Sequence, residues 1–89
     1  MNLLIVDDEY LVVEEVVTVT DWELLGITEI YSATNAVSAV RILNEKKIDI
    51  MICDIEMPQT DGLELSKKAK ENFPDLEIVM LTSHAEFNY

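Results

Sequence analysis

The amino-acid sequence predicts an α/β domain with a doubly wound parallel sheet. Four short segments are rich in apolar residues and too short for helices, which is typical of strands. They are residues 3–6, 28–33, 48–53 and 76–81. Three longer segments between them have the apolar spacing of helices, namely residues 9–19, 35–46 and 62–72. Because neighbouring parallel strands need a crossover connection, the order predicts β-α-β-α-β-α-β with helices on both faces of the sheet.

The predicted strands differ in their apolar pattern. Residues 3–6, 48–53 and 76–81 are nearly continuous apolar runs, which predicts strands covered on both faces. Residues 28–33 alternate more, with Ile30 and Tyr31 as their main apolar content. That segment is therefore expected at an edge of the sheet.

Two of the predicted helices have a clear apolar stripe. In residues 35–46 the stripe follows the i, i+3, i+4, i+7 spacing and consists of Ala36, Ala39, Val40 and Leu43. Asn35 stands at the start of this helix and is a suitable N-cap. In residues 62–72 the predicted buried face consists of Leu63, Ser66, Ala69 and Phe73. Pro74 is expected to end that helix at or before Phe73.

The segment 9–19 is ambiguous by composition alone. Val12, Val16 and Val19 have helical spacing, yet a segment this rich in valine favours a strand by propensity. The need for a crossover between adjacent parallel strands decides for a helix.

Length and charge limit the classes of function. Eighty-nine residues allow one domain, and a net charge of −12 opposes nucleic-acid binding by this segment, because phosphate contacts require Lys and Arg. The longest apolar runs are far shorter than the roughly 18 residues of a membrane span, and the acidic N-terminus is unlike a signal peptide. The single cysteine, Cys53, lies in an apolar run and is expected in the core of a cytoplasmic protein.

Candidate functional residues follow the predicted strands at their carboxyl ends, where doubly wound sheets bind ligands. Asp7 and Asp8 come after the first strand, Asp54 after the third, and Thr82 and Ser83 after the fourth. If these strands are neighbours, three carboxylates and a hydroxyl converge on one pocket. Such a cluster suits Mg²⁺, which takes one or two carboxylates, keeps several waters and accepts a phosphate oxygen.

Asp54 is the best candidate for a nucleophile. A carboxylate can accept a phosphoryl group to form an acyl phosphate, and the residues after Asp54 are specialised. Pro58 stiffens the connection, and Gly62 permits a tight approach that a Cβ would hinder. Ordinary turn chemistry is the alternative interpretation of these two residues.

The combination of motifs resembles the receiver domains of two-component response regulators over the whole chain. The motifs are Asp7-Asp8-Glu9, Asp54, Met57-Pro58, Asp61-Gly62 and Thr82. The resemblance implies a flavodoxin-like fold with strand order 2-1-3-4 in this segment. It also implies that Asp54 is the phosphoacceptor, and that Mg²⁺ (or Mn²⁺) is held by Asp7, Asp8, Asp54 and the backbone carbonyl of Glu56. Thr82 would be the switch hydroxyl. Ser83, with its small side chain, would leave access to the phosphorylation site, and His84 would lie at the pocket mouth.

The resemblance further implies partners. A sensor histidine kinase would donate the phosphoryl group, small acyl phosphates are alternative donors, and the output would be regulation of transcription. DNA would be contacted only through an output domain that is absent from this chain. Asp21-Trp22, with Phe87 and Tyr89, resembles receivers joined to AraC-type DNA-binding domains, although plain core packing is the simpler interpretation of these aromatic residues.

The resemblance also predicts what this segment lacks. Residues 1–89 would be the N-terminal portion of a receiver, without the last βα unit and the lysine that it carries. Strand 76–81 would then have an open edge, and such edges recruit other chains. The segment is therefore expected to be a homo-oligomer, with the contact made by that strand or by apolar residues such as Val12, Val16 and Ile78.

Two other classes of function stay open on the sequence. A haloacid-dehalogenase-like phosphatase also uses an aspartate nucleophile at a strand end, but its first strand should be followed by Asp-x-Asp, whereas this one is followed by Asp7-Asp8-Glu9. An interaction module that is never phosphorylated is the third class, and the presence of Asp54 with both other acids disfavours it.

Overall fold

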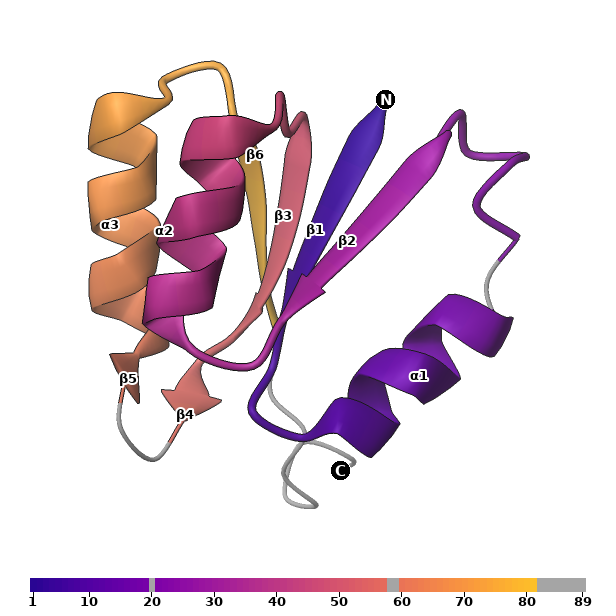
Figure 1. The fold of residues 1–89 in the computed structure, drawn as a ribbon, viewed down its shortest axis with the longest axis horizontal. Coiled ribbons are helices and arrows are strands. Elements are labelled where there is room, and N and C mark those ends of the chain that lie inside the picture. Colours follow the sequence, from indigo (N-terminus) through magenta and orange to yellow (C-terminus); the bar gives the residue numbers. More distant parts are fainter. Residues whose placement is uncertain (20, 58–59, 82–89) are drawn as a thin grey trace.

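The sheet has the predicted topology. The computed structural model describes residues 1–19, 21–57 and 60–81. Four parallel strands form a sheet in the order β2-β1-β3-β6. The strands are β1 (Asn2–Val6), β2 (Glu29–Ala33), β3 (Ile50–Asp54) and β6 (Glu77–Leu81). The helices are α1 (Tyr10–Val19), α2 (Ala36–Glu45) and α3 (Gly62–Asn72), and α2 and α3 cover one face of the sheet while α1 lies on the other (Figure 1). The predicted order and the edge position of residues 28–33 are confirmed.

Two apolar clusters fill the two sides of the sheet, because successive residues of a strand point to opposite faces. Under α2 and α3 the buried residues include Leu4, Val6, Met51, Cys53, Leu65 and Leu76. Under α1 the cluster is smaller, with Leu3, Ile5, Val13 and Ile27 buried. Within the described ranges, no helix is both long enough and apolar enough to span a membrane.

The start of α2 is as predicted. The Asn35 side chain accepts a hydrogen bond from the Ser38 amide at 2.8 Å, which satisfies one of the free N–H groups at the helix start. Ala39 and Leu43 are buried, but Val40 is exposed. Val40 lies at the margin of the stripe, beyond the part of the helix that faces the sheet.

The predicted inner face of α3 is wrong at one residue. Leu63 is exposed, whereas Leu65 is buried together with Gly62 and Ala69. The helix begins with Gly62 against the end of β3, which fixes the rotation of the helix. Residues three and seven positions after Gly62 then face the sheet, and Leu63, about 100° around the axis, faces solvent.

Helix α1 forms despite its valines, as the crossover argument predicted. The described side chains that pack beneath it are Val13, which is buried, and Val17, which packs against the smaller cluster. The side chains of Val12, Val16 and Val19 lie outside the described set, so the predicted stripe is not tested.

Strand β6 departs from the prediction that both of its faces are covered. Ile78 and Met80 pack against the cluster under α2 and α3, but Val79 and Leu81 are exposed on the opposite face. Among the described residues β6 is the last strand of the sheet, and α1 packs on the β1 side of that face. An apolar run therefore indicated a strand correctly but did not indicate how much of it is covered.

The connection from β3 to α3 contains a feature that the sequence analysis missed. β4 (Glu56–Met57) and β5 (Thr60–Asp61) form a short antiparallel pair, with Glu56 opposite Asp61. The sequence was interpreted there as a stiff turn, because two residues per strand are too few for a period-2 pattern.

Candidate functional site

The candidate site lies where β1 and β3 end side by side. Val6 pairs with Cys53, so the next residues, Asp7 and Asp54, come opposite each other at the carboxyl edge of the sheet. The chain leaves β1 toward β2 on one side, and β3 lies on the other side. This is the topological switch point, where open α/β sheets bind their ligands.

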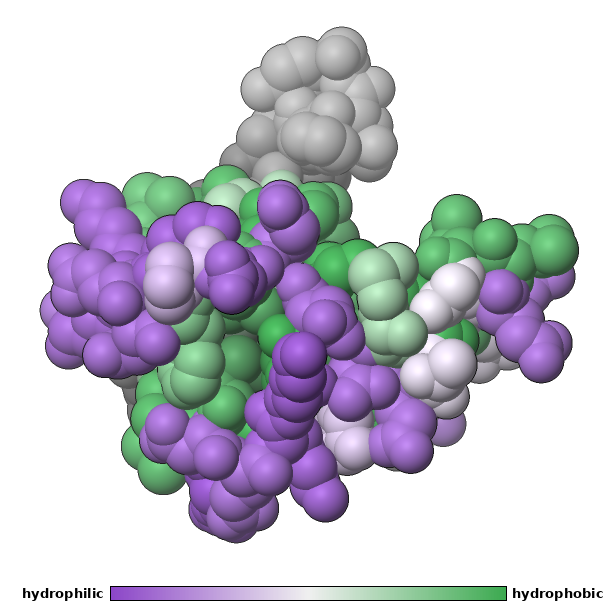
Figure 2. Space-filling model, turned by 90° about the horizontal axis from the view of Figure 1, so that it is seen from above, coloured by the Kyte–Doolittle hydropathy of each residue, from purple (hydrophilic) through white to green (hydrophobic). Residues whose placement is uncertain are grey.

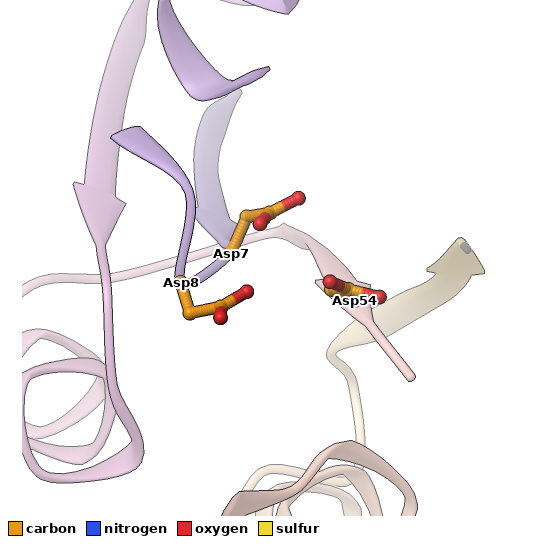
Figure 3. Close-up of side chains that lie close together, drawn as sticks. All are labelled: Asp7, Asp8 and Asp54. Atoms are coloured by element: carbon orange, nitrogen blue, oxygen red, sulfur yellow. The ribbon is translucent and has the colours of Figure 1, made fainter. Parts of the chain in front are cut away.

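Three carboxylates converge at this point (Figure 3). Each of Asp7, Asp8 and Asp54 offers an oxygen, and these oxygens lie within 4.8 Å of one another. Asp7 and Asp54 are 7% and 4% exposed, while Asp8 is open to solvent. The three acids converge as the sequence predicted, and the structure adds that two of them are buried and one is exposed.

Backbone hydrogen bonds hold these acids in place. The Asp7 amide donates to the Ala33 carbonyl of β2 at 3.1 Å, and the Glu9 amide donates to the Asp7 carboxylate at 2.9 Å. At the neighbouring strand end, the Ile55 amide donates to the Leu81 carbonyl at 2.8 Å. The Asp7 carboxylate and the backbone at both strand ends are thus held by hydrogen bonds, which reduces the reorganisation needed to bind a cation.

The electrostatics of the cluster favour a cation. Burial raises the pKa of Asp7, the Glu9 amide partly offsets this rise, and the charges of Asp54 and Asp8 add to it. The first 40 residues contain no lysine or arginine. A hard divalent cation with oxygen ligands, such as Mg²⁺, fits this donor set and would remove the repulsion.

Replacing Asp7 should therefore separate stability from metal binding. Because the pKa of Asp7 is raised, its ionised form is disfavoured in the folded chain, so its contribution to stability falls as the pH rises through the folded-state value. At pH 7 without metal, Asp7→Asn should stabilise the chain by about 0.5–2 kcal/mol, since the amide oxygen can still accept the Glu9 bond. The same variant, and Asp8→Asn, should lose the thermal stabilisation that Mg²⁺ gives the parent.

Melting curves with and without Mg²⁺ provide the measurement. Asp75→Asn is a matched control, since Asp75 is an exposed acid before β6 and outside the cluster. If Asp8→Asn kept the full response to Mg²⁺, the assignment of the metal ligands would be wrong.

Cys53 belongs to the core, as predicted. Its side chain is fully buried under α2 and α3, and burial raises the pKa of its thiol to about 11. The thiol is therefore neutral at physiological pH and lacks the thiolate character of a reactive cysteine.

Gly62 lies against the backbone of Asp54. An ideal Cβ at this position would be 2.2 Å from the Asp54 carbonyl oxygen and 3.0 Å from that of Ile55. The Gly62 amide also donates to the Ile55 carbonyl at 3.3 Å. The sequence predicted a tight approach at Gly62, and the structure shows that the approach is to the backbone of Asp54, the residue that carries the candidate nucleophile.

The structure describes only some of the other residues that the sequence analysis singled out. Glu56 is the first residue of β4, two positions after Asp54, and the role of its carbonyl stays a prediction. Thr82, Ser83, His84, Phe87 and Tyr89 lie outside the described residues, as does Pro58. Trp22 packs against the cluster under α1, and its indole N–H donates to the Val17 carbonyl at 3.2 Å, in agreement with the core-packing interpretation.

Comparison with known proteins gives a consistent answer. The family model of the response regulator receiver domain matches residues 3–89. The chain belongs to this family. It therefore functions as a phosphoacceptor domain in two-component signalling, and the match decides against a haloacid-dehalogenase-like phosphatase.

Two relatives show the context in which such receiver domains occur. The transcriptional regulatory protein YesN of Bacillus subtilis is 34% identical over 99% of this chain, which spans 24% of YesN. The response regulator UvrY of Escherichia coli is 31% identical over 97% of this chain, which spans 39% of UvrY. This chain thus spans less than half the length of these relatives.

Solved structures confirm the fold. A two-component transcriptional regulator AraC from Clostridium phytofermentans superposes with a TM-score of 0.88 at 26% identity, over 97% of this chain and 69% of that chain. The response regulator TrrA of Thermotoga maritima, solved in complex with Mg²⁺ and BeF, gives a TM-score of 0.80 at 30% identity, over 98% and 73% of the two chains.

Proposed function

We propose that Asp54 is the residue that accepts the phosphoryl group and that Asp7, Asp8, Asp54 and the Glu56 carbonyl hold Mg²⁺ (or Mn²⁺). The observation that carries the proposal is the convergence of three carboxylates from two strand ends within 4.8 Å. Asp54 is favoured as acceptor because it ends β3 at the switch point and lies next to Gly62. Asp7 and Asp8 follow β1 and are the other two carboxylate ligands of the cation.

The reaction is an in-line phosphoryl transfer. A carboxylate oxygen of Asp54 attacks the phosphorus of a donor phosphohistidine; an O–P bond forms, the P–N bond breaks, and the electron pair returns to the imidazole nitrogen. Mg²⁺ held by Asp7, Asp8 and Asp54 would supply neutralisation of the charge on the phosphoryl oxygens. The chain contributes positioning, because Asp7 is oriented by the Glu9 amide and the β3 end is tied to Leu81.

The remaining site residues have proposed roles around the phosphoryl group. Thr82 bonds a phosphoryl oxygen with its hydroxyl, and Ser83 leaves space for the donor to approach. His84 would lie at the mouth of the pocket, either as a bystander or as a modest tuner of the lifetime of the acyl phosphate. These roles rest on the family pattern, in which a hydroxyl residue follows the strand that corresponds to β6.

A sensor histidine kinase is the proposed physiological donor, in the cytoplasm, with small acyl phosphates as alternatives. The relatives named as transcriptional regulators support transcription as the output. In this proposal residues 1–89 form the N-terminal part of the receiver, and DNA is contacted by an output domain outside this segment.

Phosphorylation at Asp54 is directly testable. Incubation of the complete protein with acetyl phosphate and Mg²⁺ should add one phosphoryl group, and borohydride trapping followed by mass spectrometry should locate it at Asp54. Asp54→Asn should abolish the modification, because an amide cannot form the acyl phosphate, while Asp49→Asn, at the opposite end of β3, should keep it. Label that persisted in Asp54→Asn would disprove the assignment, and an unmodified parent would favour an interaction module.

A homo-oligomer through β6 is the proposed assembly. Val79 and Leu81 expose apolar surface on this strand, and within the described ranges its outer edge has no partner strand. Size exclusion with light scattering should give a mass above the 10.1 kDa monomer at micromolar concentration. Val79→Lys should lower that mass, and a cooperatively melting monomeric parent would refute the assembly.

A further inference from the structure

An apolar groove runs between α2 and α3, away from the acidic site. It has a volume of about 530 Å³. Its floor is formed by the buried residues Leu43, Leu65 and Ala69, and Val37 and Val40 of α2 are exposed along one wall. The other wall carries Lys68, which pairs with Glu64 at 3.4 Å. A groove of this size can accept one or two apolar side chains of a partner.

A projecting apolar turn lies on the opposite side of the molecule. Residues 22–26 connect α1 to β2 and expose Leu24 and Leu25, which are 84% and 59% accessible. Hydrogen bonds hold this turn in shape: the amides of Leu25 and Ile27 both donate to the Trp22 carbonyl, at 3.1 and 2.9 Å. The turn therefore presents two leucines on a fixed backbone, which lowers the entropy lost on binding.

The two surfaces are separate on the molecule. Figure 2 shows apolar surface on the right, where Figure 1 places the α1–β2 connection, and a second apolar area recessed between polar groups on the left, where α2 and α3 lie. One surface projects and the other is hollow, so they are complementary in shape but too far apart to meet within one molecule.

Charge is segregated in the same way. The first 40 residues, which include α1 and the turn, contain acids but no lysine or arginine. The six bases lie on α2, on α3 or directly after α2, at Arg41, Lys46, Lys47, Lys67, Lys68 and Lys70. Asp21 and Glu23 directly precede the two leucines of the turn. Turn-to-turn contact between two copies would bring like charges together, whereas turn-to-groove contact places the acidic turn beside the two helices that carry the bases, with Lys68 in the groove wall.

We infer that the groove between α2 and α3 is a docking site for the Leu24–Leu25 turn of a second copy of this chain. The contact is head-to-tail, so each molecule offers one turn and one groove, and a dimer leaves one of each free. The two leucines fill the groove, with Asp21 and Glu23 on the basic side of the partner. The contact area is small, and the association is therefore weak and concentration-dependent.

The test uses two variants at exposed positions, so that folding is preserved. Leu24→Glu destroys the turn surface and keeps the groove, while Val37→Glu, at a residue that is 73% exposed, destroys the groove and keeps the turn. Isotope-labelled Val37→Glu is titrated with unlabelled Leu24→Glu and followed by NMR. The amide signals of residues 22–26 should shift saturably, because the intact turn meets an intact groove.

The matched control is titration with unlabelled Val37→Glu, which lacks a groove and should bind at least about tenfold more weakly, since one buried leucine contributes about this much. Leu11→Glu, a change at a 76% exposed leucine on α1, should titrate like the parent. The head-to-tail contact would be overturned if both unlabelled variants gave equal shifts. It would also be overturned if signals shifted only at residues outside 22–26. If no signal shifted, the inference that a second copy of the chain occupies the groove would be wrong.

Discussion

Gly62→Ala is expected to reduce both the stability of the receiver domain and its rate of phosphorylation. The added Cβ would meet the Asp54 carbonyl oxygen at 2.2 Å, so either the start of α3 or the end of β3 must move. Overpacking of this kind costs about 1–3 kcal/mol. Because displacement of a reacting group by about 1 Å can slow a reaction by about 100-fold, the rate of acetyl-phosphate labelling should fall more than stability alone explains.

The second glycine of the chain provides a matched control. Gly26 has a φ of +81°, and a Cβ there would meet only the end of the Met1 side chain, at an ordinary contact distance of 3.9 Å. It lies at the other end of the sheet, where its carbonyl accepts from the Met1 ammonium. Gly26→Ala should lose about 1–2 kcal/mol through backbone strain but keep the labelling rate of the folded fraction. If both variants slowed labelling equally at equal folded fraction, the contact of Gly62 with Asp54 would have no role in the chemistry.

Leu4→Ala should have the largest effect on folding. Leu4 is fully buried in the centre of β1, between β2 and β3 and beneath α2 and α3. Truncating such a residue costs about 2–5 kcal/mol, the sum of lost burial and the cavity left behind. Small domains have total stabilities of about 5–15 kcal/mol, so the variant should be largely unfolded at mild urea concentrations.

Urea denaturation followed by the fluorescence of Trp22 gives the comparison. Leu11→Ala, on the exposed side of α1, should stay within about 0.5 kcal/mol of the parent. A midpoint for Leu4→Ala close to that of Leu11→Ala would contradict the placement of Leu4 at the centre of the core.

The sequence predicted those features that depend on local pattern and chain order. Continuous apolar runs located β1 and β3, and the acids that follow them located the site, because parallel strands end at one edge of a sheet. The N-cap role of Asn35 was predictable because this residue directly precedes the helical pattern of α2. These inferences need no knowledge of distances between segments.

Features that depend on packing between distant segments were not predicted. The exposure of Val79 and Leu81 depends on what lies over β6, and the choice of Leu65 over Leu63 depends on the rotation of α3 against the sheet. The raised pKa of Asp7 and the contact of Gly62 with Asp54 are set by atoms brought together only in the fold. The β4–β5 pair is too short for any periodic signal.

The edge of the sheet opposite the acids is closed by a set of ties around the N-terminus. The Met1 ammonium donates to the Gly26 carbonyl at 2.9 Å, and the Asn2 amide donates to the Asp49 carboxylate at 2.8 Å. The Thr28 amide returns to the Met1 carbonyl at 2.8 Å. A fluorophore attached at Met1 would sit roughly 20 Å from the Asp7 carboxylate, beyond the full length of β1. Because such a label on the amine would replace the ammonium that donates to Gly26, it should loosen this edge and leave the acids at the other edge in place.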